Sequence, residues 1–329
     1  MKTGKPVVVM LDWQGPENRA IIEAESLPEV ELRMVTSRDP ADLRALVADA
    51  AFFVGGVEPI PASLIESAPG LRLIHKWGVG VDKIDLVAAR ARGVPVAVTA
   101  GANAVPAAEF TVLLMLAVLR RLVARGTKLR TGEWQQARAD ARADARRLGG
   151  KIVGLVGMGA IGREVAKRVR AFEAGIRYFD PRRLPVMEEQ ALGSCFVELE
   201  ALLPEVDILS LHVPLVEPTR HLLSRERIAR LKPGAIVINT ARGAVVDEEA
   251  LAEALENGRL GGAGIDVFST EPLPATHPLL GVTSPGLVLT PHVAGSAFDN
   301  VAAIARHAFA NIRRVLRGEP LPSEDLVSQ

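Results

Sequence analysis

Three closely spaced glycines have the pattern that lets a backbone approach a phosphate group. In the segment KIVGLVGMGAIGREV, Gly157, Gly159 and Gly162 form G-x-G-x-x-G between an apolar run and an amphipathic pattern of helical period. Gly157 permits a tight strand-to-helix turn, Gly159 lets the backbone approach a pyrophosphate, and Gly162 lets helix and strand pack closely. The free N–H groups of the helix start, near Ala160 and Ile161, then face the phosphates. The pattern predicts a dinucleotide site.

An acidic residue follows at the distance expected for a contact with the adenosine ribose. Asp180 closes the next strand-like segment, GIRYFD, 18 positions after Gly162, where about 20 are typical. Its charge repels a 2′-phosphate, so NAD is predicted ahead of NADP, although Arg182 and Arg183 follow directly and can weaken this preference. The alternatives are a glycine-rich turn that binds no nucleotide and a methyltransferase-type nucleotide site.

Three further polar residues end strand-like segments in the last third of the chain. They are Arg242 in VINTARGAVVDEEAL, Glu271 in GIDVFSTEPLP and His292 in LVLTPHVAG. The carboxyl ends of parallel strands meet at one edge of an open α/β sheet, where such sheets bind ligands. Taken singly, each residue is as readily a surface charge or a hydrogen-bonded loop residue. Together they form a candidate catalytic group.

The segments that must position these residues alternate between short apolar runs and longer charged stretches. The alternation runs from Val7 to Val98 and starts again at Lys151, which predicts βαβ units and parallel sheets. The expected fold is therefore α/β, with two Rossmann-like or flavodoxin-like lobes. Further helices are expected from about Asn103 to Ala124 and from about Ala297 to Leu316, with a solvated helix or flexible arm at Ala137–Arg147.

The second lobe is expected to be inserted into the first. Because the first segment is small and the chain ends in a predicted helix, residues after about 295 should complete the N-terminal lobe. The predicted domains are a substrate-binding domain, residues 1–100 plus 295–329, and a dinucleotide-binding Rossmann domain, residues 101–294.

The motifs resemble, in order and spacing, those of the D-isomer-specific 2-hydroxyacid dehydrogenases, a family that includes phosphoglycerate dehydrogenases and glyoxylate and hydroxypyruvate reductases. The resemblance rests on GMGAIG, INTARGAVVDEEAL, GIDVFSTEP and LTPHVAG, and extends to WGVGVDKIDL and GANAVPAAEF nearer the N-terminus. It implies an NAD-dependent oxidoreductase that moves a hydride between nicotinamide and C2 of a small D-2-hydroxy or 2-keto acid. One departure is Phe110 after Glu109, where the family often has histidine.

The resemblance also implies a role for each candidate catalytic residue. Arg242 would hold the substrate carboxylate and polarise the 2-keto oxygen, since a guanidinium matches a carboxylate with two donors. His292 would act as general acid in reduction and general base in oxidation. Glu271 would bind the other ring nitrogen of His292 and fix its tautomer.

Cofactor and substrate contacts are implied at further positions. Lys76, Val79 and Gly80 would contact the substrate, the last two through backbone N–H groups. The expected cofactor contacts, beyond the glycines, the helix start and Asp180 named above, are Met158, His212, Val213, Pro214, Thr219, Thr240, Ala241, Asp266 and Gly295.

Bulk properties argue against several classes of partner. Lys plus Arg and Asp plus Glu both number 39, so no net positive field exists to hold nucleic acid. The longest apolar stretch, Phe110 to Leu119, is about half of the ~20 residues that cross a bilayer, so no membrane span is expected. The single cysteine, Cys195, allows neither an intrachain disulfide nor a thiolate metal site, and favours the cytoplasm. No metal is predicted.

Two other functions stay open from the sequence. The family resemblance also covers transcriptional corepressors, so an NAD-sensing binding module on the same fold is the alternative to an enzyme. Formate and phosphite dehydrogenases share the fold, but the resemblance implies Gln at position 271 in the former and a lysine within WGVGVD in the latter. A homodimer formed around the Asn103–Ala124 helix is also expected. The substrate itself is not identified.

Overall fold

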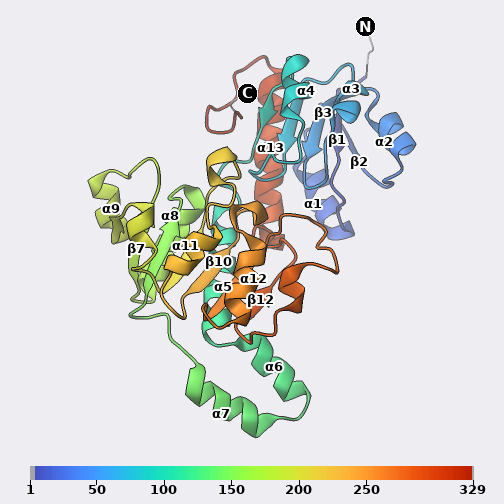
Figure 1. Ribbon diagram of the computed structural model, residues 1–329. Helices are drawn as coiled ribbons and strands as arrows, with labels where there is room; N and C mark the ends of the chain where they lie inside the picture. The colour runs from blue at the N-terminus through green and yellow to red at the C-terminus, as the bar shows by residue number, and fades with distance from the viewer. Residues whose placement is uncertain (1–3, 328–329) are drawn as a thin grey trace. The chain divides into compact units, whose positions relative to one another are not determined.

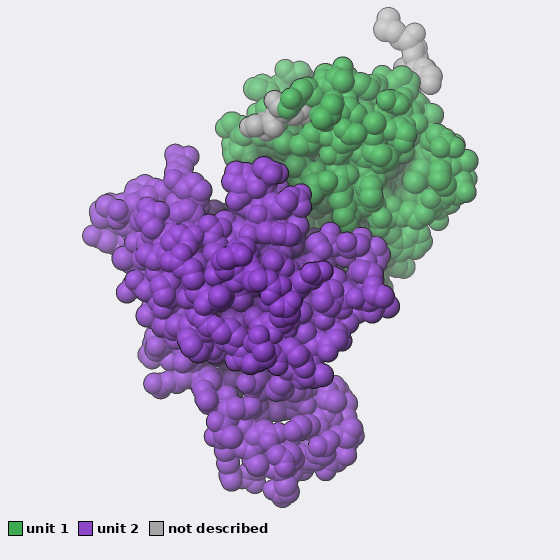
Figure 2. All heavy atoms as spheres, viewed as in Figure 1, with its two compact units in different colours: residues 1–103, 296–329 green, residues 104–295 purple. Residues whose placement is uncertain are grey.

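The structure, a computed structural model, describes residues 4–327. This part of the chain divides into two compact units, shown in Figure 2: unit 1 with residues 4–103 and 296–327, and unit 2 with residues 104–295. Unit 1 is thus formed by segments from both ends of the chain. Both sheets pair their strands in parallel, which confirms the predicted α/β class.

Unit 1 is a five-stranded sheet with the order β2-β1-β3-β4-β5. Alternate residues of β1 enter two different cores, with Val7 and Val9 on one face and Val8 and Met10 on the other. Such continuous apolar runs are typical of parallel strands covered by helices on both faces. The elements of unit 1 are β1 (Val7–Met10), α1 (Pro16–Glu25), β2 (Glu31–Met34), α2 (Pro40–Val47), β3 (Ala50–Gly55), α3 (Ala62–Glu66), β4 (Leu73–Lys76), α4 (Leu86–Ala91), β5 (Val96–Ala97), a 3-10 turn at Phe298–Asn300 and α13 (Val301–Leu316).

Unit 2 is a seven-stranded sheet with the order β12-β11-β10-β9-β6-β7-β8. Chain order reverses between β6 and β9, because the strands after β6 add first on one side and then on the other. Open α/β sheets bind ligands beyond the carboxyl ends of strands at such a reversal. The strands are β6 (Ile152–Val156), β7 (Gly175–Phe179), β8 (Ser194–Phe196), β9 (Ile208–Leu211), β10 (Ile236–Asn239), β11 (Gly262–Ile265) and β12 (Leu287–Leu289).

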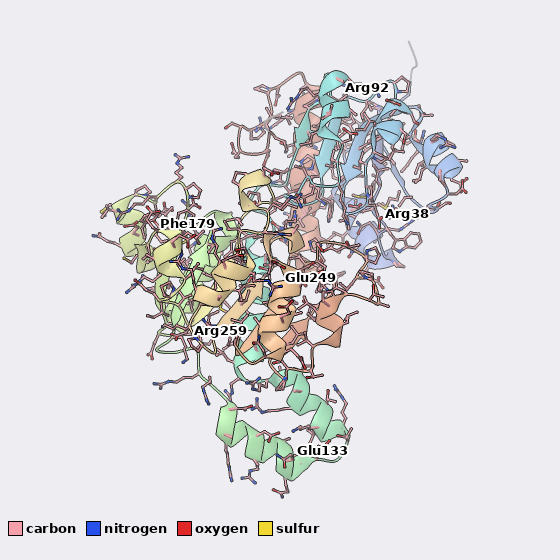
Figure 3. All side chains as sticks on the ribbon, in the orientation of Figure 1. Arg38, Arg92, Glu133, Phe179, Glu249 and Arg259 are labelled. Atoms are coloured by element: carbon pink, nitrogen blue, oxygen red, sulfur yellow. The ribbon has the colours of Figure 1, made fainter. Side chains whose placement is uncertain are left out.

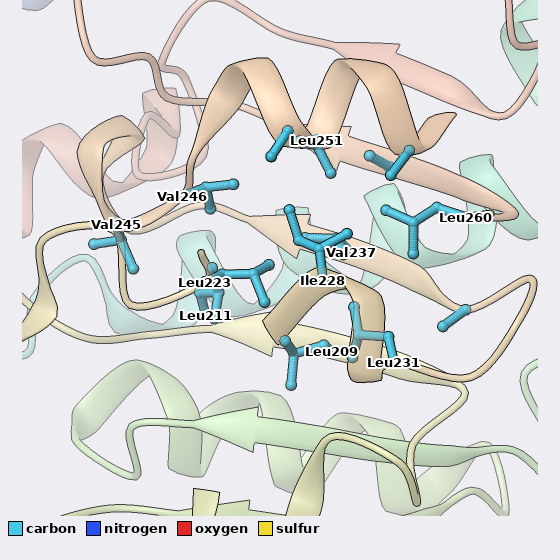
Figure 4. Packing of buried hydrophobic residues seen from close by; sticks show 14 of the residues in the cluster. Leu209, Leu211, Leu223, Ile228, Leu231, Val237, Val245, Val246, Leu251 and Leu260 are labelled. Atoms are coloured by element: carbon cyan, nitrogen blue, oxygen red, sulfur yellow. The ribbon is translucent and has the colours of Figure 1, made fainter. Parts of the chain in front are cut away.

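Helices cover both faces of this sheet (Figure 1). On one face α5 packs on β10 and β11 and α8 packs on β6 and β7. On the other face α11 and α12 pack on β9 and β10, where Leu209, Ile228, Val237 and Leu251 meet (Figure 4). The helices of unit 2 are α5 (Ala104–Leu119), α6 (Leu122–Arg130), α7 (Trp134–Asp144), α8 (Ala160–Ala171), α9 (Val186–Leu192), α10 (Leu199–Leu202), α11 (Arg225–Arg230) and α12 (Glu248–Glu256), with 3-10 turns at Glu217–Thr219, Gly243–Val245 and Pro278–Gly281.

The predicted helix from Asn103 to Ala124 is wrong at its C-terminal end. Helix α5 stops at Leu119, Arg121 has the left-handed φ of +46°, and α6 starts at Leu122. The carbonyl of Leu119 accepts the N–H of Arg146 at 3.0 Å instead of a helical partner. The segment after α7 therefore contacts the end of α5. This contact joins residues that are distant in sequence, so no local sequence pattern predicts it.

Helices α6 and α7 form a hairpin that extends away from the sheet of its own unit (Figure 1). Neither helix contains a buried residue, and Lys128 pairs with Asp140 between them at 2.5 Å. The segment predicted as a solvated helix or flexible arm thus forms most of α7. Within residues 4–327, no helix combines the length and the apolarity that spanning a membrane requires.

Candidate active site

The glycine motif forms the turn between β6 and α8. Gly157 has a φ of +99°, which L side chains rarely adopt, and a Cβ at this position would lie 2.4 Å from the carbonyl oxygen of His212. A Cβ at Gly162 would lie 2.2 Å from the carbonyl oxygen of Gly157. Both positions therefore require glycine, one for its conformation and both for lack of space.

Gly159 differs from both because a Cβ there would meet no described atom within 4 Å. This residue caps the N-terminus of α8, whose first turn contains Ala160 and Ile161. Two crowded glycines thus shape the turn, and the third leaves open space in front of the unpaired N–H groups of the helix. Such a cradle fits the pyrophosphate of NAD.

Asp180 is tied directly to this turn. It follows Phe179, the last residue of β7, which is labelled in Figure 3. Its Oδ2 atom accepts the N–H of Met158 at 2.8 Å and its Oδ1 atom accepts the N–H of Arg182 at 2.8 Å. The structure therefore places Asp180, the residue predicted to bind the ribose, beside the turn predicted to bind the pyrophosphate. The adenosine half of NAD requires this arrangement.

The loop after β9 borders the glycine turn. Val213 lies against it, since its Cγ1 atom would be 3.1 Å from a Cβ at Gly157. The Nε2 atom of His212 lies 2.9 Å from Ser210 Oγ, and although part of the residue stays accessible, desolvation of the ring lowers its pKa to about 4. His212 is therefore neutral at pH 7. Thr219 binds within its own turn, donating to the carbonyl of Pro214 at 2.6 Å, so it shapes this loop.

The three candidate catalytic residues follow three neighbouring strands. Arg242 lies three residues after β10, Glu271 six residues after β11 and His292 three residues after β12, and these strands are adjacent in the sheet. Their carboxyl ends share the edge that also carries the glycine turn after β6. Residues far apart in sequence are thus gathered at one edge.

Glu271 and His292 form a direct pair. The Nδ1 atom of His292 lies 3.0 Å from Oε1 and 2.9 Å from Oε2 of Glu271. Glu271 Oε1 also accepts the N–H of Phe268 at 3.1 Å, which holds the carboxylate in place. His292 has a left-handed φ of +54° and a side chain that is 45% exposed. With Nδ1 bound to the carboxylate, the ring offers Nε2 to a substrate.

Arg242 is held by its own loop and by a very close backbone approach. Its carbonyl accepts Asn239 Nδ2 at 2.9 Å, and Asn239 Oδ1 accepts the N–H of Ala241 at 3.0 Å. A Cβ at Gly243 would lie 1.9 Å from the carbonyl carbon of Phe268. The missing side chain therefore lets the loop of Arg242 pack against the loop that leads to Glu271.

Asp266 holds the segment that carries His292. This residue is fully buried, and its carboxylate accepts Thr290 Oγ1 at 2.6 Å and the N–H groups of Val293 and Ala294 at 3.0 and 2.8 Å. Its carbonyl accepts the N–H of His292 at 2.7 Å. Asp266 therefore positions the loop that ends near Gly295, and its expected contact with the cofactor stays a prediction.

Thr240 lies at the end of β10 in the same group of loops. Its hydroxyl is 2.9 Å from that of Thr111 on α5, which connects the strand end to the long apolar helix. Among the expected cofactor contacts, Thr240 and Ala241 thus sit directly before Arg242.

The predicted substrate residues lie in unit 1, at the carboxyl end of β4. Lys76 is its last residue and is buried, whereas Val79 is 39% exposed. The loop is held by Thr99, whose hydroxyl donates to the carbonyl of Lys76 at 3.0 Å, while the N–H of Thr99 binds the carbonyl of Gly78 at 2.8 Å. Gly80 follows in the same loop, which leaves the sheet at the edge where ligands bind in this topology.

Several positioning residues were not predicted from the sequence. Asn239, Gly243, Thr290 and Thr99 each hold a loop that carries a candidate residue. A weak signal exists for two of them: Asn239 is a polar end to the apolar run AIVI, and Gly243 directly follows Arg242.

Comparison with known proteins finds a family match within unit 2 and relatives that extend beyond it. The family model described as "D-isomer specific 2-hydroxyacid dehydrogenase, NAD binding domain" matches residues 112–294. A glyoxylate reductase of Thermofilum pendens is 41% identical over 266 residues, which are 81% of this chain and 78% of that protein. A D-3-phosphoglycerate dehydrogenase of Mycobacterium tuberculosis is 36% identical over 318 residues, 96% of this chain and 58% of that longer protein.

A solved structure shares the fold over nearly the whole chain. The NAD-dependent formate dehydrogenase of Staphylococcus aureus in complex with NAD has a TM-score of 0.84 and 28% identity, and covers 98% of this chain and 99% of that one. The predicted family, fold and cofactor are therefore confirmed. The chain belongs to the D-isomer-specific 2-hydroxyacid dehydrogenases, NAD-binding oxidoreductases that act on the CH–OH group of 2-hydroxy acids.

Proposed function

We propose that this chain transfers a hydride between the nicotinamide of NAD and C2 of a small D-2-hydroxy or 2-keto acid. The observation that carries this proposal is the pair of Glu271 and His292, joined through Nδ1 at 2.9 Å and placed beside the loop of Arg242. A carboxylate-bound imidazole with its second nitrogen available is suited to moving a proton to or from an alcohol oxygen.

His292 is the general acid and base in this proposal. When bound, NAD supplies or accepts the hydride. In reduction, Nε2 of His292 donates a proton to the oxygen on C2, and in oxidation the same atom removes the hydroxyl proton. Glu271 keeps the ring oriented, as carboxylates do in related dyads.

Arg242 binds the carboxylate at C1 and polarises the oxygen at C2. Its planar guanidinium matches a carboxylate with two parallel donors. The close approach at Gly243 and the bonds from Asn239 support this role, since they fix the backbone from which the guanidinium extends.

We assign substrate recognition to unit 1, through the backbone N–H groups of Val79 and Gly80 and through Lys76. The support is that this loop is held in place by Thr99 at the carboxyl edge of its sheet. Unit 2 binds the cofactor, in agreement with the family match over residues 112–294. The placing of the protein in a reducing cytoplasm stays a prediction from its single cysteine.

The relatives support an enzyme more than an NAD-sensing module. Each of those described above is an enzyme by name, so they lend no support to a corepressor-like role. Glu271 stands where the family resemblance implies glutamine in formate dehydrogenases, which argues against formate as substrate.

A substrate panel tests the proposal. We expect oxidation of NADH with at least one of glyoxylate, hydroxypyruvate and pyruvate, and, in the reverse direction, reduction of NAD by a D-2-hydroxy acid and not by its L-isomer. D-3-phosphoglycerate and formate are tested with NAD in parallel. Absence of turnover with every 2-keto and 2-hydroxy acid would contradict the proposal.

Replacing His292 tests the assigned chemistry. His292→Asn should lower kcat by about 10²–10⁴-fold, since general acid–base catalysis contributes on this order. Asparagine tolerates the left-handed φ of this position, so the loop and the Kd for NAD measured by calorimetry should be retained. His221→Asn is the matched control, because His221 is also exposed with a φ of +47°. Equal turnover in the two variants would refute the assignment.

We also propose a homodimer formed by α5 together with the α6–α7 hairpin. The support is an apolar groove of about 350 Å³ lined by Leu113, Leu116, Leu122 and Ala141 among others, beside a hairpin that buries none of its own residues. A second copy of the chain is the expected occupant, since closed two-fold dimers are the commonest oligomers.

A further inference from the structure

Three arginines lie near the end of β7, where the adenosine ribose is expected. Arg182 and Arg183 follow Asp180 directly, and Arg163 on the first turn of α8 lies close enough to Asp180 for the carboxylate to stabilise its charge. Guanidinium groups in such a place are the usual partners of a 2′-phosphate in NADP. The chain therefore carries arginines of the kind that bind the 2′-phosphate of NADP, next to Asp180, whose charge repels that phosphate.

Arg183 is bound to a carboxylate on α9. Its Nε and Nη2 atoms donate to Oε1 and Oε2 of Glu189 at 2.9 and 3.0 Å, and its guanidinium lies 5.3 Å from the centre of the Phe196 ring. Glu189 is itself anchored, because it accepts the buried hydroxyl of Tyr178 at 2.6 Å. These bonds hold the pKa of Glu189 below its ordinary value, so the carboxylate stays charged at neutral pH.

Arg163 is paired in the same way with Glu188, the residue before Glu189 on α9. Its Nε and Nη2 atoms donate to the two carboxylate oxygens of Glu188 at 2.7 and 3.1 Å. The bond to Arg163 also holds the pKa of Glu188 below its ordinary value. Adjacent residues of α9 thus bind two of the three arginines, each with both carboxylate oxygens.

We propose that Glu188 and Glu189 determine the preference for NAD over NADP by holding Arg163 and Arg183 away from the ribose. With Asp180 included, three carboxylates match the three arginines, so a 2′-phosphate meets no net positive charge. Asp180 repels that phosphate, and the two glutamates withhold the groups that would otherwise bind it. Glu189 should have the larger effect on the preference for NAD, because Tyr178 holds its carboxylate in place.

This inference rests on the proposed placement of the ribose beside Asp180, so the test begins there. Kd values for NAD⁺, NADP⁺ and adenosine 2′,5′-bisphosphate are measured by calorimetry with the full chain. Asp180→Asn keeps an oxygen for the N–H of Met158 and removes the charge. We expect weaker binding of NAD⁺. An unchanged Kd for NAD⁺ and NADP⁺ would place the ribose elsewhere, which is a failure of the proposed site.

The inference itself is tested by adding Glu189→Gln to Asp180→Asn. The glutamine oxygen can still accept the hydroxyl of Tyr178, but the negative charge is removed and the amide nitrogen cannot accept Nη2 of Arg183. We expect the Kd for NADP⁺ to fall by a further factor of about ten, equal to about 1.4 kcal/mol, with the Kd for NAD⁺ unchanged. Adding Arg183→Gln should reverse this gain. No gain from Glu189→Gln, or a gain that survives Arg183→Gln, would overturn the inference.

Two further variants control for structure and charge. Glu188→Gln in the same Asp180→Asn background tests the more exposed pair and should give a smaller gain in the same direction, which keeps the inference testable if Glu189→Gln does not fold. Glu253→Gln removes an equal charge from a carboxylate that also binds one arginine with both of its oxygens, accepting Nη1 and Nη2 of Arg225 on α11. It should change neither Kd. A gain as large in Glu253→Gln would mean that overall charge, and not the pairs on α9, sets the preference.

Discussion

Glycine residues at the active edge of unit 2 serve two different purposes. Gly157, Gly162 and Gly243 permit backbone approaches that a Cβ would block, so they serve the fold. Gly159 faces open space, so its missing side chain serves the ligand. The two purposes can be separated by the same substitution at two positions.

Gly243→Ala should destabilise unit 2, whereas Gly159→Ala should not. A Cβ at Gly243 would lie 1.9 Å from the Phe268 carbonyl carbon, and the loops of Arg242 and Glu271 would have to separate, at a cost on the order of 3 kcal/mol. Thermal unfolding followed by circular dichroism should show a lower Tm for this variant alone. Gly159→Ala should keep its Tm and raise the Kd for NAD⁺, since its methyl group would occupy the space of the pyrophosphate. Equal Tm values for the two variants would contradict this assignment.

Some residues could be predicted because their role depends on local spacing, whereas Arg242, Glu271 and His292 were predicted through the family resemblance. The glycine turn and Asp180 lie within one βαβ unit, so their proximity follows from the pattern. Gly243 and Thr290 act on residues of other loops, at Phe268 and Asp266, and these contacts exist because β10, β11 and β12 are neighbours. Such roles need the order of strands in the sheet, which the sequence does not contain.

At the scale of elements, α13 and the residues after it join unit 1 through a buried polar network. His75 on β4 is fully buried, and its Nε2 atom lies 3.1 Å from Nδ2 of Asn311 on α13. Asn311 donates to Asp325 at 2.9 Å, and His307 Nε2 lies 2.7 Å from the same carboxylate oxygen. Asp325 and α13 are thus connected to the strand that leads to the predicted substrate loop.

This network makes the stability of unit 1 depend on pH. Burial, with a smaller effect of the neighbouring His307, lowers the pKa of His75 to about 4, against an ordinary value of 6.5. Between pH 6.5 and about 4, His75 binds a proton in the unfolded chain but not in the folded one. The contribution of His75 to the free energy of unfolding is therefore full above pH 6.5 and falls as the pH decreases toward 4. Between pH 7 and pH 5 we expect a loss of about 2 kcal/mol from this residue. Urea unfolding at several pH values measures it.

His75→Gln should be less stable at pH 7 but lose less stability between pH 7 and pH 5. His212 in unit 2, whose pKa burial also lowers to about 4, changes stability in the same direction, so the variant removes one of two contributions. His221→Asn, at an exposed position, should keep the full slope. A slope in His75→Gln equal to that of the unchanged chain would show that this histidine does not titrate in the expected range.

The elements themselves were predicted best where one face is buried at a regular period. Helix α13 buries Val301, Ile304, Ala305, Ala308 and Ile312, a spacing of three and four residues that is visible in the sequence. The end of α5 was missed because no glycine or proline marks it. There the bond between Leu119 and Arg146 sets the boundary, and it depends on how α7 returns to the sheet.

On the scale of the whole molecule, the α6–α7 hairpin is a part of unit 2 whose two helices contain no buried residue. Leu122, Leu129 and Trp134 are each more than half exposed, and Leu113 on α5 lines the same groove as Leu122. Small helical pairs without a buried face depend on other contacts for their stability. The proposed homodimer supplies such contacts from a second copy of the chain.

Sedimentation equilibrium tests this dimer. The unchanged chain should sediment with twice its mass of 35.1 kDa. Leu113→Glu combined with Leu122→Glu places charges in the groove beside the hairpin and should give the monomer mass, because burying unpaired carboxylates at an interface costs several kcal/mol. Val87→Glu, at a residue of α4 that is 79% exposed, is the matched control and should remain a dimer. A monomeric unchanged chain would refute the dimer, whereas a double variant that stays dimeric would move the interface away from α5 and the hairpin.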